Sequence, residues 1–84
     1  MRSDPDGTIR QHAQLIVNPA AGGGRSRRAA AKLETFLRAA DFPYERADTT
    51  GPGHARALAA ASAGLVIVAG GDGTVNEVVD GLPT

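Results

Sequence analysis

The chain has 84 residues, with nine basic and nine acidic side chains, so its formal net charge is zero. A chain of this length buries only about 60–65% of the surface that its unfolded form exposes, which leaves one small domain with little core to spare. The balanced charge argues against nucleic acid as a partner, and the absence of cysteine excludes disulfide scaffolds, thiolate zinc sites and thiol catalysis.

The first segment, residues 1–11, is polar and has no apolar run of the kind that a signal peptide needs. We therefore expect a solvated tail over residues 1–11 and a folded domain over residues 12–84. The longest uncharged stretch, residues 57–71, is broken by a serine and by glycines and falls short of the ~20 residues that span a bilayer. A cytoplasmic protein is the expectation.

The first predicted strand is the apolar run 14–17, which ends at Asn18 and Pro19 because proline cannot donate to a further strand ladder. From Ser26 onward the apolar residues recur with the period of a helix, which predicts a helix over about residues 26–40. The apolar face of this helix consists of Ala30, Leu33, Leu37 and Ala40.

The next elements alternate in the same way. Residues 42–47 alternate between polar and apolar side chains, which predicts a second and more exposed strand, and the breaker-rich residues 48–53 predict a loop. Residues 55–63 are good helix formers and predict a short helix that ends at Gly64.

The third strand is predicted over residues 65–69, which are continuously apolar, rich in β-branched side chains and bounded by glycines. We expect it to be central and covered by helices on both faces. A third helix is predicted to begin at Thr74, where Thr74 and Glu77 match a capping box. Its expected apolar face consists of Val75, Val78, Val79 and Leu82.

The order β-α-β-α-β-α predicts an α/β fold with a three-layer parallel sheet. Glycine- or threonine-rich segments follow all three strands, at residues 18–24, 49–53 and 70–74. Because the carboxyl ends of parallel strands meet at one edge, we expect these three loops to converge. Glycine-rich backbone followed by a helix N-terminus suits a phosphate group, so the sequence predicts a polyphosphate-binding site.

Several of these residues have a second, purely structural interpretation. Thr74 and Glu77 can cap a helix without contacting a ligand, and Gly22–Gly24 can be a flexible connection. Three arginines after the first loop form either a solvated helix face or a phosphate clamp: Arg25, Arg27 and Arg28. Asp72 stands between glycines beside the predicted phosphate site, which favours a role with magnesium or in proton transfer.

The motifs in these loops resemble those of the diacylglycerol kinase catalytic domain family, which includes sphingosine and bacterial lipid kinases. Residues 70–79 read GGDGTVNEVV and resemble the family signature. Residues 15–22 read LIVNPAAG and resemble its opening strand and loop, and residues 48–55 resemble the threonine-containing loop that follows the second strand. The resemblance runs from about residue 14 to residue 82.

The resemblance implies the N-terminal portion of an NAD kinase/diacylglycerol kinase-like nucleotide-binding domain, with ATP and Mg²⁺ as cofactors. The function implied is transfer of the ATP γ-phosphate to a lipid hydroxyl, on a diacylglycerol-like or sphingoid lipid. Asp72 matches the aspartate that orients or deprotonates the attacking hydroxyl. The nucleotide-binding positions implied are Asn18, Pro19, Ala20, Ala21, Gly22, Thr49, Gly70, Gly71, Asp72, Gly73, Thr74, Val75 and Asn76. No residue is assigned as a metal ligand.

Kinases of this family are longer, two-domain proteins, so we expect residues 12–84 to be a truncated catalytic domain that is inactive alone. The lipid would be bound by a C-terminal part outside this chain, at a location that is cytoplasmic or peripheral to the membrane. Uncovered sheet or helix surface would then support a homo-oligomer. Two alternatives stay open, an NAD-kinase-like phosphorylation of a nucleotide and a non-catalytic nucleotide-binding chain.

Overall fold

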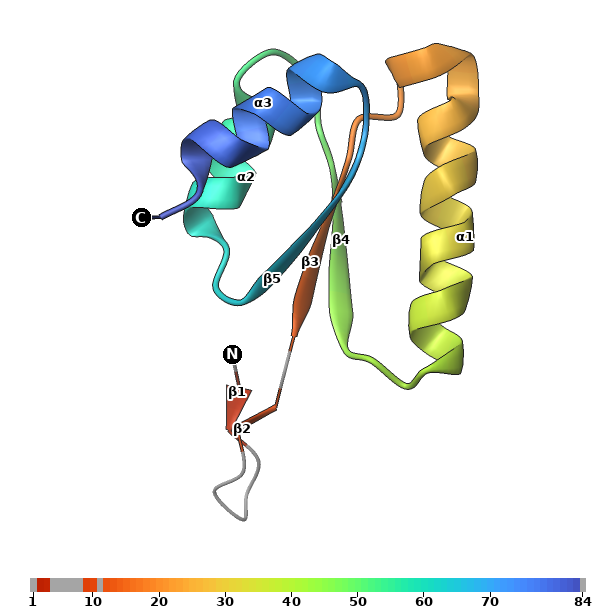
Figure 1. Ribbon diagram of the computed structural model, residues 1–84, viewed down its shortest axis with the longest axis vertical. Helices are drawn as coiled ribbons and strands as arrows, with labels where there is room; N and C mark the ends of the chain where they lie inside the picture. Colours follow the sequence, from red (N-terminus) through yellow and green to blue (C-terminus); the bar gives the residue numbers. More distant parts are fainter. Residues whose placement is uncertain (1, 4–8, 11, 84) are drawn as a thin grey trace.

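The structure, a computed structural model, describes residues 2–3, 9–10 and 12–83 (Figure 1). Near the N-terminus, the short strands β1 (Arg2–Ser3) and β2 (Ile9–Arg10) pair antiparallel. This pairing, within the expected tail, was not predicted from the sequence. The remainder of that expected tail lies outside the described residues.

The main sheet has three parallel strands in the order β4-β3-β5 (Figure 1). Strand β3 covers Ala13–Val17, β4 covers Tyr44–Asp48 and β5 covers Leu65–Ala69. In register, Ala13 of β3 faces Tyr44 on one side and Leu65 on the other. The three strands therefore end level with one another, at Val17, Asp48 and Ala69.

Helices cover both faces of this sheet, as the α/β prediction requires. Helix α1 (Arg25–Ala39), preceded by the 3-10 turn η1 (Ala21–Gly24), lies on one face. Helices α2 (His54–Ala61) and α3 (Asp72–Gly81) lie together on the other, so Figure 1 shows three layers. None of the helices in the described part of the chain is long and apolar enough to cross a membrane.

The core consists of two layers that the alternation of β3 side chains separates. Leu15 and Val17 point toward α1, and Ile16 points toward α2 and α3; all three are fully buried. The layer beneath α1 contains Leu15, Val17, Ala30 and Ala69. The layer beneath α2 and α3 contains Ile16, Ala55, Ala59 and Val78. Small alanine side chains let the helices approach the sheet closely.

The prediction that residues 65–69 form the central strand is wrong. Strand β3 pairs on both sides, whereas β5 pairs only with β3 and leaves one edge open. A continuous apolar run indicates that both faces of a strand are covered, and β5 does contact α1 and α3 on its two faces. The same pattern carries no information about which strands pair at its edges.

The predicted apolar face of α3 is mostly exposed. Val78 is buried, but Val75, Val79 and Leu82 are 42%, 64% and 37% exposed. Leu65 at the start of β5 is 47% exposed. These four exposed side chains, Leu65, Val75, Val79 and Leu82, are called the uncovered apolar residues below.

Candidate functional site

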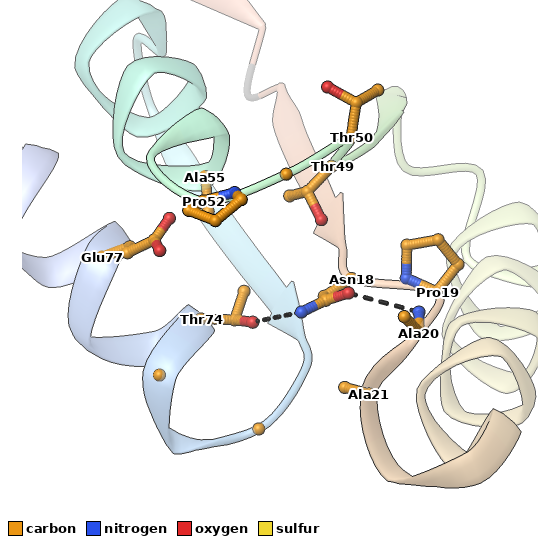
Figure 2. Close-up of a pocket in the computed structure, with 13 residues that line it drawn as sticks. Asn18, Pro19, Ala20, Ala21, Thr49, Thr50, Pro52, Ala55, Thr74 and Glu77 are labelled. Atoms are coloured by element: carbon orange, nitrogen blue, oxygen red, sulfur yellow. Dashed lines mark hydrogen bonds between the residues drawn. The ribbon is translucent and has the colours of Figure 1, made fainter.

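A cavity of about 420 Å³ opens where the three strand-end loops converge, as the sequence predicted (Figure 2). Its walls come from the segment after β3, the segment after β4 and the start of α3. The lining residues are Asn18, Pro19, Ala20, Ala21, Thr49, Thr50, Gly51, Pro52, Ala55, Gly71, Gly73, Thr74 and Glu77. The cavity therefore lies beyond the carboxyl ends of the strands, where ligands bind in open parallel sheets.

Asn18 connects the first wall of the cavity to the third. Its side-chain Nδ2 donates to Thr74 Oγ1 over 2.9 Å, and its Oδ1 accepts the Ala20 N–H over 3.2 Å (Figure 2). Its backbone N–H donates to the Ala69 carbonyl oxygen over 2.9 Å. One asparagine thus fixes the turn after β3, the end of β5 and the first turn of α3 relative to one another.

The glycines of η1 turn the chain sharply from the first wall into α1. Gly22, Gly23 and Gly24 have φ values of +64°, +62° and +99°, which favour glycine because they lie in the left-handed region. Arg25 Nε donates to the Gly22 carbonyl oxygen over 3.1 Å and so stabilises this turn. Gly22 does not line the cavity.

The cluster of three arginines also lies outside the cavity lining. Arg25, Arg27 and Arg28 are all exposed at the start of α1. Of the two interpretations that the sequence left open, this placement favours the solvated helix face over a clamp built into the cavity.

The second wall is the segment after β4. The Thr49 N–H donates to the Val17 carbonyl oxygen over 2.7 Å and so continues the pairing of β4 with β3 by one residue. The Thr50 N–H donates to His54 Nδ1 over 3.0 Å, and the Gly53 N–H donates to Glu77 Oε1 over 3.2 Å. The backbone of this wall is therefore held by α2 on one side and by α3 on the other.

The third wall is the beginning of α3, and here the predicted capping box is wrong. The helix begins at Asp72 with Gly71 as its N-cap, and no side chain caps it. Thr74 instead accepts from Asn18, and Glu77 accepts from Gly53. Both side chains have partners on other segments of the chain, which a pattern based on helix capping alone does not consider.

Gly70 allows the close approach of β5 and α3. A Cβ atom at Gly70 would lie 2.7 Å from Cβ of Thr74, which is too close for any side chain without a shift of the helix. At Gly71 and Gly73, by contrast, no atom lies within 4 Å of the position of an added Cβ. The backbone at these two glycines is open toward the cavity, so its N–H groups and the positive end of the α3 dipole are accessible to an anion.

The structure brings together eight of the thirteen residues predicted to bind a nucleotide. Those that line the cavity are Asn18, Pro19, Ala20, Ala21, Thr49, Gly71, Gly73 and Thr74. The others do not line it, namely Gly22, Gly70, Asp72, Val75 and Asn76. Asp72 is exposed in the first turn of α3, between two lining glycines.

Five lining residues were not among the predicted ones: Thr50, Gly51, Pro52, Ala55 and Glu77. Three of them belong to the loop 49–53, which the sequence predicted to lie at this edge of the sheet. All residues of that loop could therefore have been predicted to line the cavity. For Ala55 the sequence contains no sign. Glu77 carried a signal, but its spacing from Thr74 suggested a helix cap.

Backbone donors dominate the chemistry of this cavity. Glu77 is the one charged side chain among the lining residues, and no lysine or arginine lines it. The described residues contain no cluster of three or more histidine, aspartate or glutamate side chains that could hold a metal ion unaided. An anion here would be bound by N–H groups and hydroxyls.

Two comparisons bear on this arrangement. The sequence model of the diacylglycerol kinase catalytic domain matches residues 12–84. Sphingoid long-chain bases kinase 1 of Arabidopsis thaliana is 40% identical to this chain over 77 residues, which cover 83% of the chain. The chain spans about 10% of the length of that relative.

Proposed function

The chain belongs to the diacylglycerol kinase catalytic domain family, and from this premise we propose that it is the N-terminal, ATP-binding portion of a lipid kinase. In this proposal the cavity holds the phosphates of ATP, and the enzyme transfers the γ-phosphate to a lipid hydroxyl. The observation that carries the proposal is the convergence of three glycine- or threonine-containing loops around one cavity of about 420 Å³.

Phosphoryl transfer depends mainly on positioning and on stabilising charge, which is what an array of backbone donors supplies. The N–H groups at the start of α3, from Gly71 to Thr74, would bind phosphate oxygens together with the helix dipole. On the first wall, Asn18 would bind a second phosphate through the Nδ2 hydrogen that its bond to Thr74 leaves free. The N–H groups of Ala20 and Ala21 already donate to Asn18, so they would shape this wall and not bind phosphate directly. Thr49, on the second wall, would also contact the nucleotide.

Mg²⁺ suits this cavity as a partner of the nucleotide, because it binds proteins through one or two carboxylates and completes its shell with phosphates and water. Two carboxylates are placed for this, Glu77 in the lining and Asp72 beside it, whereas the carboxylate of Asp48 at the end of β4 pairs with Arg46. When bound, the ion would neutralise charge on the transferring phosphate.

We assign to Asp72 the role of orienting or deprotonating the lipid hydroxyl. Its exposed position outside the cavity lining is consistent with a group that meets an acceptor arriving from solvent or from a membrane. In a kinase that contains this segment, Asp72→Asn should abolish lipid phosphorylation and leave the dissociation constant of ATP within a factor of about two. An unchanged rate would remove Asp72 from the mechanism.

Gly71→Val tests the nucleotide site in the 84-residue chain itself. A Cβ added at Gly71 meets no atom within 4 Å beyond its chain neighbours, and the φ of Gly71, −87°, is open to any residue. We therefore expect the variant to fold normally and to weaken ATP binding by about tenfold or more, because the side chain fills the cavity. Isothermal titration with Mg·ATP measures the dissociation constant.

The control is Ala31→Val, which places the same valine side chain at an exposed site on α1. It should bind ATP as the unchanged chain does. If Gly71→Val also binds ATP normally, the cavity is not the nucleotide site. If the unchanged chain binds ATP but no kinase that contains it phosphorylates a lipid, a purely nucleotide-binding role is favoured instead.

A further inference from the structure

We infer that His54 and Glu77 are positioning residues that hold the second wall of the cavity, Thr49–Gly53, in place for the nucleotide. His54 holds the beginning of this segment and Glu77 holds its end. The inference rests on the proposed ATP site, and we call Thr49–Gly53 the threonine loop.

The threonine loop has few buried contacts that could hold its conformation. Thr50, Gly51, Pro52 and Gly53 are all exposed. Two of them are glycines, and Gly53 has a φ of +83°. A segment without buried apolar contacts has a low local stability, so its conformation depends on the hydrogen bonds made by its backbone.

At the beginning of the loop, the Thr50 N–H donates to His54 Nδ1 over 3.0 Å. The Thr50 hydroxyl lies 3.3 Å from the same nitrogen. A backbone N–H can only donate, so Nδ1 must carry a lone pair and the neutral ring must carry its proton on Nε2. One specific tautomer of His54 is therefore part of the loop structure.

At the end of the loop, Glu77 Oε1 accepts the Gly53 N–H over 3.2 Å. Glu77 is on α3, the helix whose N-cap and first turn provide Gly71, Gly73 and Thr74 to the third wall. This hydrogen bond therefore sets the separation between two walls of the cavity. Figure 2 shows Glu77 beside Pro52 and Ala55, across from Asn18.

These contacts indicate positioning rather than direct binding by the loop amides. The N–H groups of Thr50 and Gly53 are already used by His54 and Glu77, so they are not donors for a phosphate. His54 does not line the cavity. Its effect on a nucleotide must therefore act through Thr49 and Thr50, which do.

The experiment compares substitutions that keep or remove the acceptor at His54. In His54→Asn, the side-chain Oδ1 takes the place of Nδ1 and can still accept the Thr50 N–H. In His54→Gln the acceptor is displaced by one bond, and His54→Leu has none. Dissociation constants for Mg·ATP are measured by titration of the ¹⁵N-labelled 84-residue chain, followed through amide chemical shifts.

We expect the dissociation constant of Mg·ATP for His54→Asn to lie within a factor of about two of that for the unchanged chain. His54→Gln and His54→Leu should bind Mg·ATP about three- to tenfold more weakly, as the loss of one hydrogen bond implies. Ser62→Ala serves as the control, since it removes a side-chain hydrogen bond of 2.7 Å from the far end of α2. It should not alter ATP binding. Equal affinities for the Asn and Leu variants would overturn the role of His54.

Glu77 is tested in the same way. Glu77→Gln keeps an acceptor for the Gly53 N–H, whereas Glu77→Ala removes it. We expect a smaller loss of protection from amide exchange at Gly53 in the Gln variant than in the Ala variant. Equal protection of Gly53 in both would show that Glu77 does not hold the loop.

The spectra separate this inference from the proposed function. The ¹⁵N shifts of the His54 ring report its tautomer, and the Thr50 amide reports the hydrogen bond, both without any nucleotide. Suppose that the unchanged chain does not bind ATP, that the His54 ring is the Nε2–H tautomer, and that the Thr50 amide is protected from exchange only in the unchanged chain and the Asn variant. The proposed function then fails, whereas His54 still holds the threonine loop. A ring with its proton on Nδ1 overturns the positioning role.

Discussion

At the scale of single residues, the site depends on side chains that connect segments rather than on charged groups. Asn18 contacts the turn that follows it, the end of β5 and the first turn of α3. Thr74 is 7% exposed and receives one of these hydrogen bonds. An amide is suited to this position because it donates and accepts without bringing charge beside a bound phosphate.

Asn18→Asp tests whether phosphate lies at this position. The Thr74 hydroxyl can rotate to donate to the new carboxylate, so we expect stability to urea within about 0.5 kcal/mol of the unchanged chain. The added negative charge should weaken ATP binding by about tenfold or more, because like charges repel within the cavity. Calorimetric titration measures this change.

Asn18→Ala is the complementary variant, since it removes both side-chain hydrogen bonds without adding charge. It should lower the free energy of unfolding by about 1–2 kcal/mol. If Asn18→Asp binds ATP as tightly as the unchanged chain, the phosphates lie away from the first wall.

The sequence predicted these residues unevenly. The position of Asn18, Gly71 and Gly73 at the cavity was predictable, because a glycine-rich turn after an apolar strand lets a ligand approach the backbone closely. The partners of Thr74 and Glu77 were not, since each lies on a segment distant in the sequence. The local spacing matches a capping box equally well. The packing of α3 against the turn after β3 and against the start of α2 decides between the two interpretations.

At the scale of helices and strands, α2 and α3 pack directly against each other. A Cβ at Gly81 would overlap the carbonyl oxygen of Arg56 and would also lie 3.0–3.1 Å from two further backbone atoms of that residue. Arg56 and Asp80 form an ion pair of 3.7 Å at the same contact. The end of α3 thus rests directly on the backbone of α2.

Gly81→Ala should therefore separate the two helices and lower the free energy of unfolding by about 2 kcal/mol or more, as overpacking does. Gly73→Ala is the matched control within the same helix, where an added Cβ meets nothing within 4 Å. Alanine favours helix over glycine, so Gly73→Ala should raise stability by about 0.5–1 kcal/mol. Urea unfolding of both variants gives the comparison, and equal values for the two would contradict the close contact.

A separate network stabilises the contact between α1 and β4. Tyr44 Oη donates to Glu34 Oε1 over 2.8 Å, and Arg46 donates to Glu34 Oε2 over 2.8 Å and to Asp48 Oδ1 over 2.7 Å. These hydrogen bonds hold the pKa of Glu34 below its usual value and raise that of Tyr44. Charged side chains along β4 also make that open edge of the sheet a poor partner for another strand.

Helix and strand positions followed from periodicity, and their arrangement in the sheet did not. The three strands of the main sheet and their helices lie within about two residues of the predicted bounds, because the period of apolar side chains and the positions of glycines reflect local geometry. The order β4-β3-β5 depends on which edges pair, and residues 15–17 and 65–69 are both apolar throughout. Nothing in either run distinguishes a central strand from an edge strand.

At the scale of the whole molecule, the two edges of the sheet differ in character. The β4 edge carries the ion-pair network described above. The β5 edge is open, and the uncovered apolar residues lie on β5, on α3 and directly after α3. We propose that this second edge is where copies of the chain associate, since an exposed apolar strand edge is a template for pairing.

The expected outcome is that the chain self-associates in sedimentation velocity experiments at concentrations of tens of micromolar or above. Val79→Lys should shift the distribution toward monomer, because Val79 is 64% exposed and a charge there disfavours an apolar contact. Phe36 on α1 is similarly exposed, at 68%, and lies on the other face of the sheet. Phe36→Lys should leave the distribution unchanged, and a chain that stays monomeric without any substitution would contradict the proposal.

The central position of β3 also determines the order in which the molecule can assemble. Strand β3 is synthesised first in the main sheet, and it can complete its pairing only when β4 and β5 are present, since Ala13 pairs with Tyr44 and with Leu65. The Asn18–Thr74 contact then joins residues 56 positions apart. Pairings so distant in the sequence form slowly, because the intervening chain must first be ordered. Helix α1 can therefore form early during folding, whereas the cavity exists only after the last helix has docked.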